Sequence, residues 1–202
     1  MDRILVIAPH PDDETLGCGG TLLKAKQQGH EINWLVVTNT LSRYPMLQKV
    51  EEVLGPRIQL GFMAACLDIE NFGEIVKNIG YWIKEVRAEI LYIPFHSDIH
   101  TDHQIVFKAA YSCTKQFRFP SIKQVFMHEV LSQTDFSHDV FQPNTFVGIT
   151  MFMDEKIELM RCYNSELVYP RGPDNVRALA TYRGGRIGVK YAEAFQLVLW
   201  KT

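Results

Sequence analysis

The sequence lacks the features that mark several large classes of protein. It has no excess of basic residues, with 21 Lys and Arg against 23 Asp and Glu, so it offers no broad cationic face to a phosphate backbone. No stretch approaches the roughly 18 apolar residues of a membrane span, and the N-terminal MDRILVIAPH carries too short an apolar run for a signal peptide. We therefore expect a soluble, cytoplasmic protein that binds no nucleic acid and has no membrane span.

Closely spaced cysteines are also missing. The four cysteines, at positions 18, 66, 113 and 162, form no Cys-x-x-Cys pattern, which suits free thiols in a reducing compartment better than a disulfide scaffold. The chain has 202 residues, 47% of them hydrophobic, and no internal repeat, low-complexity tract or linker. This length and composition predict one domain over residues 1–202 with a full core of its own.

Predicted strands and helices alternate along the chain. Short apolar runs rich in β-branched residues predict strands at 3–8, 32–37, 57–60 and 90–94. Helical spacing of apolar residues predicts helices at 15–28, 45–54 and about 71–87, and a further helix that begins near Asp102 or His103. Beyond these, strands are expected at 125–131, 146–150 and 195–200, and a helix at 155–166.

This alternation predicts an α/β fold of the Rossmann-like, doubly wound type, with a mainly parallel sheet and helices on both faces. In the common strand order 3-2-1-4-5, strands one and four are neighbours at the point where the order reverses. Ligands bind there, outside the carboxyl ends of the strands. The loops after these two strands, 9–14 and 96–103, are therefore the expected functional loops.

The two loops are rich in side chains that bind metals. Two histidines and one carboxylate with open positions form the pattern of a catalytic zinc site or of an Fe(II) facial triad. We predict that His10, Asp13 and His103 bind Zn²⁺, with Fe²⁺ as the other ion that suits this set. The alternative for each residue alone is ordinary: a loop histidine is usually solvated, and acids before a helix usually serve its N-terminus.

The remaining loop residues have the types that hydrolysis needs. Asp12, next to the ligand Asp13, is the candidate base that takes a proton from water. His100 is the candidate cationic donor to an oxyanion or a leaving amine, with Asp102 available to orient and charge it. Asp102 could instead be the N-cap of its helix.

Glycines 17, 19 and 20 permit a competing interpretation as a dinucleotide-binding loop. That motif opens directly after the first strand and is followed by an acid at the end of strand two. Here a six-residue charged loop intervenes, and strand two ends in Thr38, Asn39 and Thr40. These glycines are better explained by a close approach of the helix to the metal loop or to a neighbouring strand.

The two loops and the end of the chain resemble a known family. The residues Pro-His-Pro-Asp-Asp-Glu at 9–14, the glycines that follow, and His-Thr-Asp-His at 100–103 are similar to the paired motifs of the LmbE-like, or PIG-L, deacetylases. Arg183, Gly184, Gly188 and residues 191–195 resemble the closing segment of that family. The resemblance implies a Rossmann-like fold and zinc-dependent removal of acetyl from an N-acetylglucosamine-type sugar amine. It implies the same roles for the loop residues as the chemistry above.

Two arginines are candidate substrate contacts. Arg43 resembles an arginine that many family members place near the substrate, and a helix cap is its alternative. Arg171 could contact a phosphate or carboxylate of a larger substrate, and a solvated loop arginine is the alternative there. The segment 38–44 is short and lacks the acidic, glycine-rich character of many members.

The predicted function is a metal-dependent hydrolase that deacetylates an N-acetylated amino sugar, a small molecule that can be part of a nucleotide sugar or a glycoside. The alternative is a metal-dependent carbohydrate-binding protein without turnover. A pure binder needs the ligands but has no use for a base and an acid beside them, so Asp12 and His100 favour the enzyme. Phosphoester hydrolysis is a third possibility, disfavoured because no second metal set is visible. Assembly as a homo-oligomer stays open.

Overall fold

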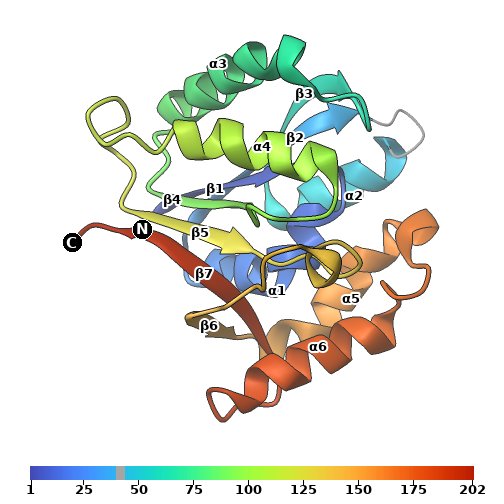
Figure 1. Ribbon diagram of the computed structural model, residues 1–202. Helices are drawn as coiled ribbons and strands as arrows, with labels where there is room; N and C mark the ends of the chain where they lie inside the picture. Colours follow the sequence, from blue (N-terminus) through green and yellow to red (C-terminus); the bar gives the residue numbers. More distant parts are fainter. Residues whose placement is uncertain (40–43) are drawn as a thin grey trace.

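A seven-stranded sheet forms the centre of the molecule (Figure 1). The computed structural model describes residues 1–39 and 44–202. The strand order is β3-β2-β1-β4-β5-β7-β6, and the strands are β1 (Arg3–Ala8), β2 (Glu31–Asn39), β3 (Arg57–Met63), β4 (Ile90–Pro94), β5 (Gln124–His128), β6 (Thr145–Gly148) and β7 (Ala192–Trp200). The first five strands pair in parallel, and β7 pairs antiparallel with both β5 and β6.

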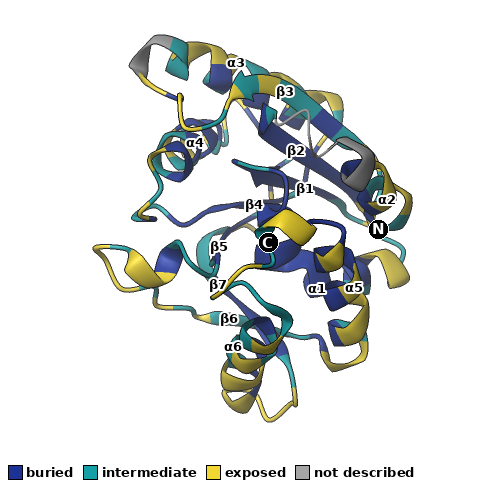
Figure 2. Ribbon diagram, turned by 90° about the vertical axis from the view of Figure 1, so that its right-hand side faces the viewer, coloured by how far each residue is buried: buried dark blue, intermediate teal, exposed yellow. Residues whose placement is uncertain are grey.

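Helices cover both faces of this sheet. They are α1 (Asp13–Gln27), α2 (Tyr44–Leu54), α3 (Ile69–Glu85), α4 (Thr101–Ser112), α5 (Met153–Arg161) and α6 (Pro173–Gly185), with short 3₁₀ turns η2 (Thr134–Phe136), η3 (Thr150–Phe152) and η4 (Asn164–Glu166). Residues of α3 and α4 form one apolar core against the sheet, and residues of α1, α2 and α5 form another on the opposite face. Strands β1, β2, β4 and β5 are consequently almost entirely buried, whereas β3 and β6 are mostly partly exposed (Figure 2).

The predicted doubly wound α/β fold is confirmed, including the order 3-2-1-4-5 of the first five strands. The first and fourth strands have the predicted bounds, and the other elements differ from prediction by a few residues at their ends. Two features were not predicted. Helix α6 has no counterpart among the predicted elements, and the sheet continues beyond β5 through two antiparallel strands.

The first functional loop is held close to the sheet by a glycine in α1. A Cβ on Gly17 would lie 2.4 Å from Nδ1 of His128, at the end of β5. The expected close approach to a neighbouring strand is therefore found at Gly17, where a larger residue would have to displace His128. Gly19 and Gly20 instead lie against Lys156 of α5 and Ile149.

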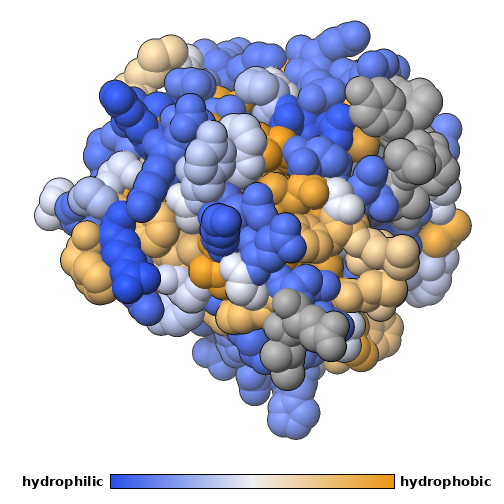
Figure 3. Space-filling view, turned by 90° about the horizontal axis from the view of Figure 1, so that it is seen from above, coloured by the Kyte–Doolittle hydropathy of each residue, from blue (hydrophilic) through white to orange (hydrophobic). Residues whose placement is uncertain are grey.

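The described residues also show the state of the cysteines and the character of the helices. Their cysteines are free thiols, as predicted, and no described helix is long and apolar enough to cross a membrane. Seen from above, the molecule presents a mainly hydrophilic surface, with apolar residues gathered near the middle of that face (Figure 3).

Candidate metal and catalytic site

The loops after β1 and β4 meet at one edge of the sheet because these two strands are parallel neighbours. Helix α1 begins directly at Asp13, whose carboxylate accepts a hydrogen bond from the backbone N–H of His10 at 2.8 Å. Helix α4 begins at Thr101 and carries His103 in its first turn, fully buried. The loops after β1 and β4, with the first turns of α1 and α4, thus bring His10, Asp13 and His103 together.

Three ligand atoms of these residues form a small triangle. Nδ1 of His10 lies 3.4 Å from Oδ2 of Asp13 and 3.2 Å from Nε2 of His103. Nε2 of His103 lies 3.2 Å from the same Asp13 oxygen. The three atoms therefore face one common point.

This triangle fits a tetrahedral metal ion. Ligand atoms about 2.0–2.2 Å from a tetrahedral zinc lie about 3.3–3.6 Å from one another, close to the separations found here. Two imidazoles and one carboxylate are the donor set of a catalytic site with an open position. Asp13 and His103 are buried and His10 is half-buried, so the residues present suit a divalent cation.

The pKa values of the two histidines also favour a bound cation. Burial alone would lower the pKa of His10, but hydrogen bonds to Asp102 and Asp13 outweigh it and raise that pKa to about 9. Burial is likewise outweighed at His103, where the charge of Asp13 and the bonds to Asp13 and Asp98 raise the pKa to about 10. The carboxylates thus draw protons onto both imidazoles, and a metal cation can take the place of those protons.

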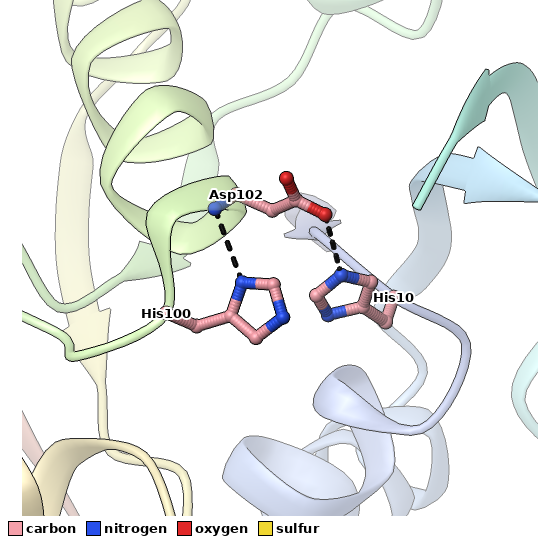
Figure 4. A group of neighbouring side chains, drawn as sticks. All are labelled: His10, His100 and Asp102. Atoms are coloured by element: carbon pink, nitrogen blue, oxygen red, sulfur yellow. Dashed lines mark hydrogen bonds and ion pairs between the residues drawn. The ribbon is translucent and has the colours of Figure 1, made fainter. Parts of the chain in front are cut away.

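The sequence analysis expected the Asp102 side chain to pair with His100, but in the structure it pairs with another residue. Its carboxylate contacts Nε2 of His10 at 2.9 Å (Figure 4). The same carboxylate accepts backbone N–H groups of Ala65 at 2.7 Å and Leu67 at 3.3 Å. The structure shows no side-chain hydrogen bond between His100 and Asp102, both of which it describes, because the start of α4 turns the Asp102 side chain toward His10 and the loop after β3. Burial and the neighbouring histidines lower the pKa of His100, although the charge of Asp102 still raises it in the expected direction.

His100 caps helix α4 instead. Its Nδ1 accepts the backbone N–H of Asp102 at 3.1 Å (Figure 4), so His100, not Asp102, is the N-cap. Burial lowers the pKa of His100, and the nearby rings of His10 and His103 lower it further. The expected cationic form is thus disfavoured, and the ring is set to present a neutral Nε2–H.

Asp12 lies next to the triangle in an unusual backbone conformation. Its φ of 135° falls in the left-handed region that favours glycine, and its side chain is almost completely buried. The buried carboxylate of Glu14 accepts the Asp12 backbone N–H at 3.2 Å, and the hydroxyls of Thr15 and Tyr163 donate to that carboxylate at 2.6 and 2.5 Å. Glu14 and its partners therefore support the strained peptide of Asp12.

A cavity of about 250 Å³ opens over these groups. Its lining residues are His10, Asp12, Asp13, Ala64, Ala65, His100, Gln133, Glu166 and Arg171. The guanidinium of Arg171 lies 3.4 Å from Asp12 and 3.0 Å from Glu166. Arg171 thus reaches the site, whereas Arg43 lies outside the described residues.

A second group of possible ligands, His10, His100 and Asp102, overlaps the first. It suits an ion less well, because the Asp102 oxygens already accept two backbone N–H groups and Nδ1 of His100 accepts a third. The triangle with Asp13 is the better candidate.

The sequence analysis gave no role to three residues that complete the site. Asp98 contacts Nδ1 of His103 at 3.0 Å, and both side chains are fully buried. Glu14 supports Asp12, and Glu166 lines the cavity beside Arg171. Asp98 and Glu14 were visible in the two functional loops, but nothing in the sequence around Glu166 distinguishes it from other surface acids.

Comparison with known proteins identifies the family of the chain. The family model of the GlcNAc-PI de-N-acetylases, PIG-L, matches residues 5–114. The match spans more than half of the chain, and the protein belongs to this family of deacetylases. A diacetylchitobiose deacetylase of Thermococcus kodakarensis is 24% identical, and the alignment covers 98% of this chain and 84% of that protein.

Solved structures share the fold over nearly the whole chain. The conserved protein TT1542 from Thermus thermophilus is 27% identical with a TM-score of 0.81, covering 98% of this chain and 95% of that one. GalB, the 4-carboxy-2-hydroxymuconate hydratase from Pseudomonas putida KT2440, also has a TM-score of 0.81 at 16% identity, covering 100% and 98%. The fold therefore hosts more than one reaction, and the site must decide between them.

Proposed function

We propose that this protein is a metal-dependent N-deacetylase that hydrolyses the acetamide of an N-acetylglucosamine-type amino sugar. The observation that carries this proposal is the triangle of His10, Asp13 and His103 with Asp12 and His100 lining the same cavity. Membership of a de-N-acetylase family and a relative that acts on diacetylchitobiose support the substrate class.

The proposed resident ion is Zn²⁺, and Fe²⁺ suits the same ligands. When bound, such an ion polarises the amide carbonyl and lowers the pKa of water to about 7. His10, Asp13 and His103 would hold it, and His10 and Asp13 also line the cavity.

Asp12 is the proposed base. Its carboxylate takes one proton from the attacking water while the oxygen forms a bond to the carbonyl carbon. When the carbon–nitrogen bond breaks, the same carboxyl group can return that proton to the nitrogen, which leaves as the free sugar amine. The second product is acetic acid, which still carries the other proton of the water; it passes that proton to the amine and leaves as acetate, so atoms and charges balance with water as the only co-reactant.

His100 is the proposed donor to the developing oxyanion. Its Nδ1 already accepts a backbone N–H, so its proton sits on Nε2, and that group can donate without a net charge. A fixed donor of this kind stabilises negative charge that appears only in the transition state.

Arg171 is proposed to contact sugar hydroxyls. Two carboxylates already balance its charge, which makes it a poorer partner for a phosphate or carboxylate than the sequence analysis expected. Glu166 beside it can accept a hydroxyl hydrogen bond. A role for Arg43 in substrate binding remains a proposal from the sequence alone.

A mass-spectrometric screen tests the function. N-acetylglucosamine, diacetylchitobiose, UDP-N-acetylglucosamine and related glycosides are incubated with the zinc-loaded protein, and we expect loss of one acetyl group from at least one of them, with release of acetate. The matched control is Asp12→Asn, which keeps the shape of the base; it should retain its metal while kcat falls by roughly 10²- to 10⁴-fold.

Other outcomes would point elsewhere. Sugar binding by metal-loaded protein without acetate release would favour the binding protein without turnover. Addition of water to an unsaturated acid would favour a hydratase such as GalB. Normal turnover by Asp12→Asn would remove Asp12 as the base and leave Glu14 as the next carboxylate to test.

A further inference from the structure

Both histidines of the triangle have a second ring nitrogen that points away from the common point. At His103 this is Nδ1, which contacts the Asp98 carboxylate at 3.0 Å. Neither side chain has any solvent exposure. Water therefore does not compete for this hydrogen bond, which makes the bond stronger than an exposed one.

Asp98 is itself held in place at the turn before α4. The side chain of Gln104 donates to the backbone carbonyl of Asp98 at 2.7 Å, and the hydroxyl of Thr134 lies 3.4 Å from its Oδ2. The carboxylate thus has a fixed position from which to orient the His103 ring.

At His10 the outward nitrogen is Nε2, and Asp102 plays the corresponding part at 2.9 Å. Asp98 also accepts the backbone N–H of His100 at 3.4 Å, within its own loop, whereas Asp102 connects to a different loop. Its two oxygens accept the backbone N–H groups of Ala65 and Leu67, in the loop between β3 and α3. Ala65 lines the cavity, so one carboxylate joins a ligand of the triangle to the cavity wall.

These contacts fix where each imidazole carries its proton. A neutral imidazole that donates from one nitrogen offers a lone pair at the other. With Nε2 of His10 and Nδ1 of His103 donating to carboxylates, the lone pairs lie on Nδ1 of His10 and Nε2 of His103, the two atoms of the triangle. Carboxylates in this position make a histidine a better and better-oriented ligand.

We propose that Asp98 and Asp102 are positioning residues that each orient one metal-binding histidine, and that Asp102 also ties the metal centre to the cavity wall at Ala65–Leu67. This proposal rests on the proposed function, because it assigns roles around the same metal site. It gives Asp102 a part different from the expected partnership with His100.

Metal affinity tests the proposal directly. The protein is stripped of metal, and its affinity for Zn²⁺ is measured by competition with a chromophoric chelator, for wild type, Asp98→Ala and Asp102→Ala. Each variant should bind zinc about 10- to 100-fold more weakly. The matched control is Asp135→Asn, which changes an exposed carboxylate that accepts the backbone N–H of Ser132; its affinity should equal that of wild type.

The asparagine variants separate the two roles and guard against failure to fold. Asparagine at 98 keeps an oxygen for His103, so Asp98→Asn should weaken zinc binding less than Asp98→Ala. Asparagine at 102 has one oxygen for three donors, so Asp102→Asn should release the Ala65–Leu67 loop. With zinc saturating, Asp102→Asn should therefore raise KM, while Asp98→Asn leaves KM near that of wild type.

Two results would overturn the proposal. One is wild-type zinc affinity in folded Asp98 and Asp102 variants, even with a lowered melting temperature, because that would make both carboxylates merely structural. The other is an unchanged KM in Asp102→Asn, which would end the link to the cavity wall. The variant His103→Ala distinguishes failure of the proposed function: full zinc binding by that protein would show that the metal site itself is misassigned.

Discussion

The imidazole of His100 illustrates how one backbone contact decides a side chain's chemistry. The N–H of Asp102 occupies its Nδ1, and protonation there would break the cap of α4. Burial and the neighbouring histidines lower its pKa as well. At neutral pH the ring is therefore an uncharged donor through Nε2, and it becomes protonated only below the ordinary pKa of a histidine.

This state of His100 gives a testable prediction. Loss of an oxyanion donor in His100→Ala should lower kcat by roughly 10²- to 10³-fold. Glutamine also carries an uncharged N–H donor, so His100→Gln should retain more activity than His100→Ala. Because a neutral donor does not lose a proton at alkaline pH, the alkaline limb of kcat/KM should keep its position in both His100→Gln and Asp102→Asn.

The measurement is the pH profile of acetate release for wild type and these three variants. Equal loss in the glutamine and alanine variants, together with a flattened alkaline limb, would restore the cationic His100 of the sequence analysis.

Sequence reasoning reached the candidate ligands but not their partners. The positions of His10, Asp13 and His103 follow from which loops a doubly wound sheet brings together, and that order is a property of strand alternation. The partner of Asp102 depends instead on the backbone at Ala65, whose φ of 57° is set by a loop with no sequence signal for it. Side-chain direction at a helix start cannot be predicted before that loop is known.

At the scale of elements, helix α1 depends on contacts from the end of the chain. The carboxylate of Glu193 in β7 accepts the backbone N–H groups of Gly20 and Thr21 at 2.9 and 2.7 Å. Lys156 of α5 pairs with Glu193 at 2.6 Å and donates to the carbonyl of Leu16 at 2.8 Å. The closing segment, noted only as a resemblance, therefore supports the helix that carries Asp13.

Gly17 provides a test of how tightly α1 packs on β5. Alanine there would place a Cβ 2.4 Å from the buried ring of His128 and 3.2 Å from the carbonyl of Glu129. We expect Gly17→Ala to destabilise the protein by about 1–3 kcal/mol, the usual cost of overpacking. The matched control is Gly73→Ala in α3, where no described atom outside the helix's own backbone lies within 4 Å of the added Cβ and alanine should stabilise the helix by about 0.5–1 kcal/mol.

Urea unfolding of both variants measures this difference. A Gly17→Ala protein as stable as Gly73→Ala would mean that His128 moves aside freely and that α1 is not closely packed on the strand.

Helix α6 was not predicted because its sequence carries a weak periodic signal. Its buried residues are Val176, Ala180 and Gly184, of which only the first is a sizeable apolar side chain. The glycine is needed because a Cβ there would lie 2.5 Å from the carbonyl of Val189. Small residues that allow close packing look, in the sequence, like an exposed loop.

At the scale of the whole molecule, alternation of strands and helices was enough to predict five strands in order. The antiparallel addition of β7 and β6 was not predictable in the same way. Right-handed crossovers constrain parallel neighbours, but no comparable rule fixes on which edge, or in which direction, the last strands join the sheet. The place and direction of β7 depend instead on tertiary contacts such as that of Glu193 with α1.

One buried group links the stability of the whole fold to pH. His128 is fully buried at the end of β5, and neither ring nitrogen has a hydrogen-bond partner among the described residues. Burial lowers its pKa to about 4, against about 6.5 in an unfolded chain. The folded protein therefore keeps this ring neutral at pH values where the unfolded chain protonates it.

The sign of the effect follows from that difference. Above about pH 6.5 neither state protonates His128, and its contribution to stability is constant. As the pH falls from about 6.5 toward 4, the unfolded chain gains a proton that the folded protein does not, so the free energy of unfolding decreases.

Between pH 7 and pH 5, His128 should lower the free energy of unfolding by about 2 kcal/mol. In His128→Gln that part of the pH dependence should disappear, whatever the variant's absolute stability. Urea unfolding of both proteins at pH 5, 6, 7 and 8 measures the two slopes, and because His10 and His103 are present in both, their titration cancels in the comparison. Parallel curves for wild type and His128→Gln would show that His128 is protonated equally in both states and that its burial does not control the acid stability of the fold.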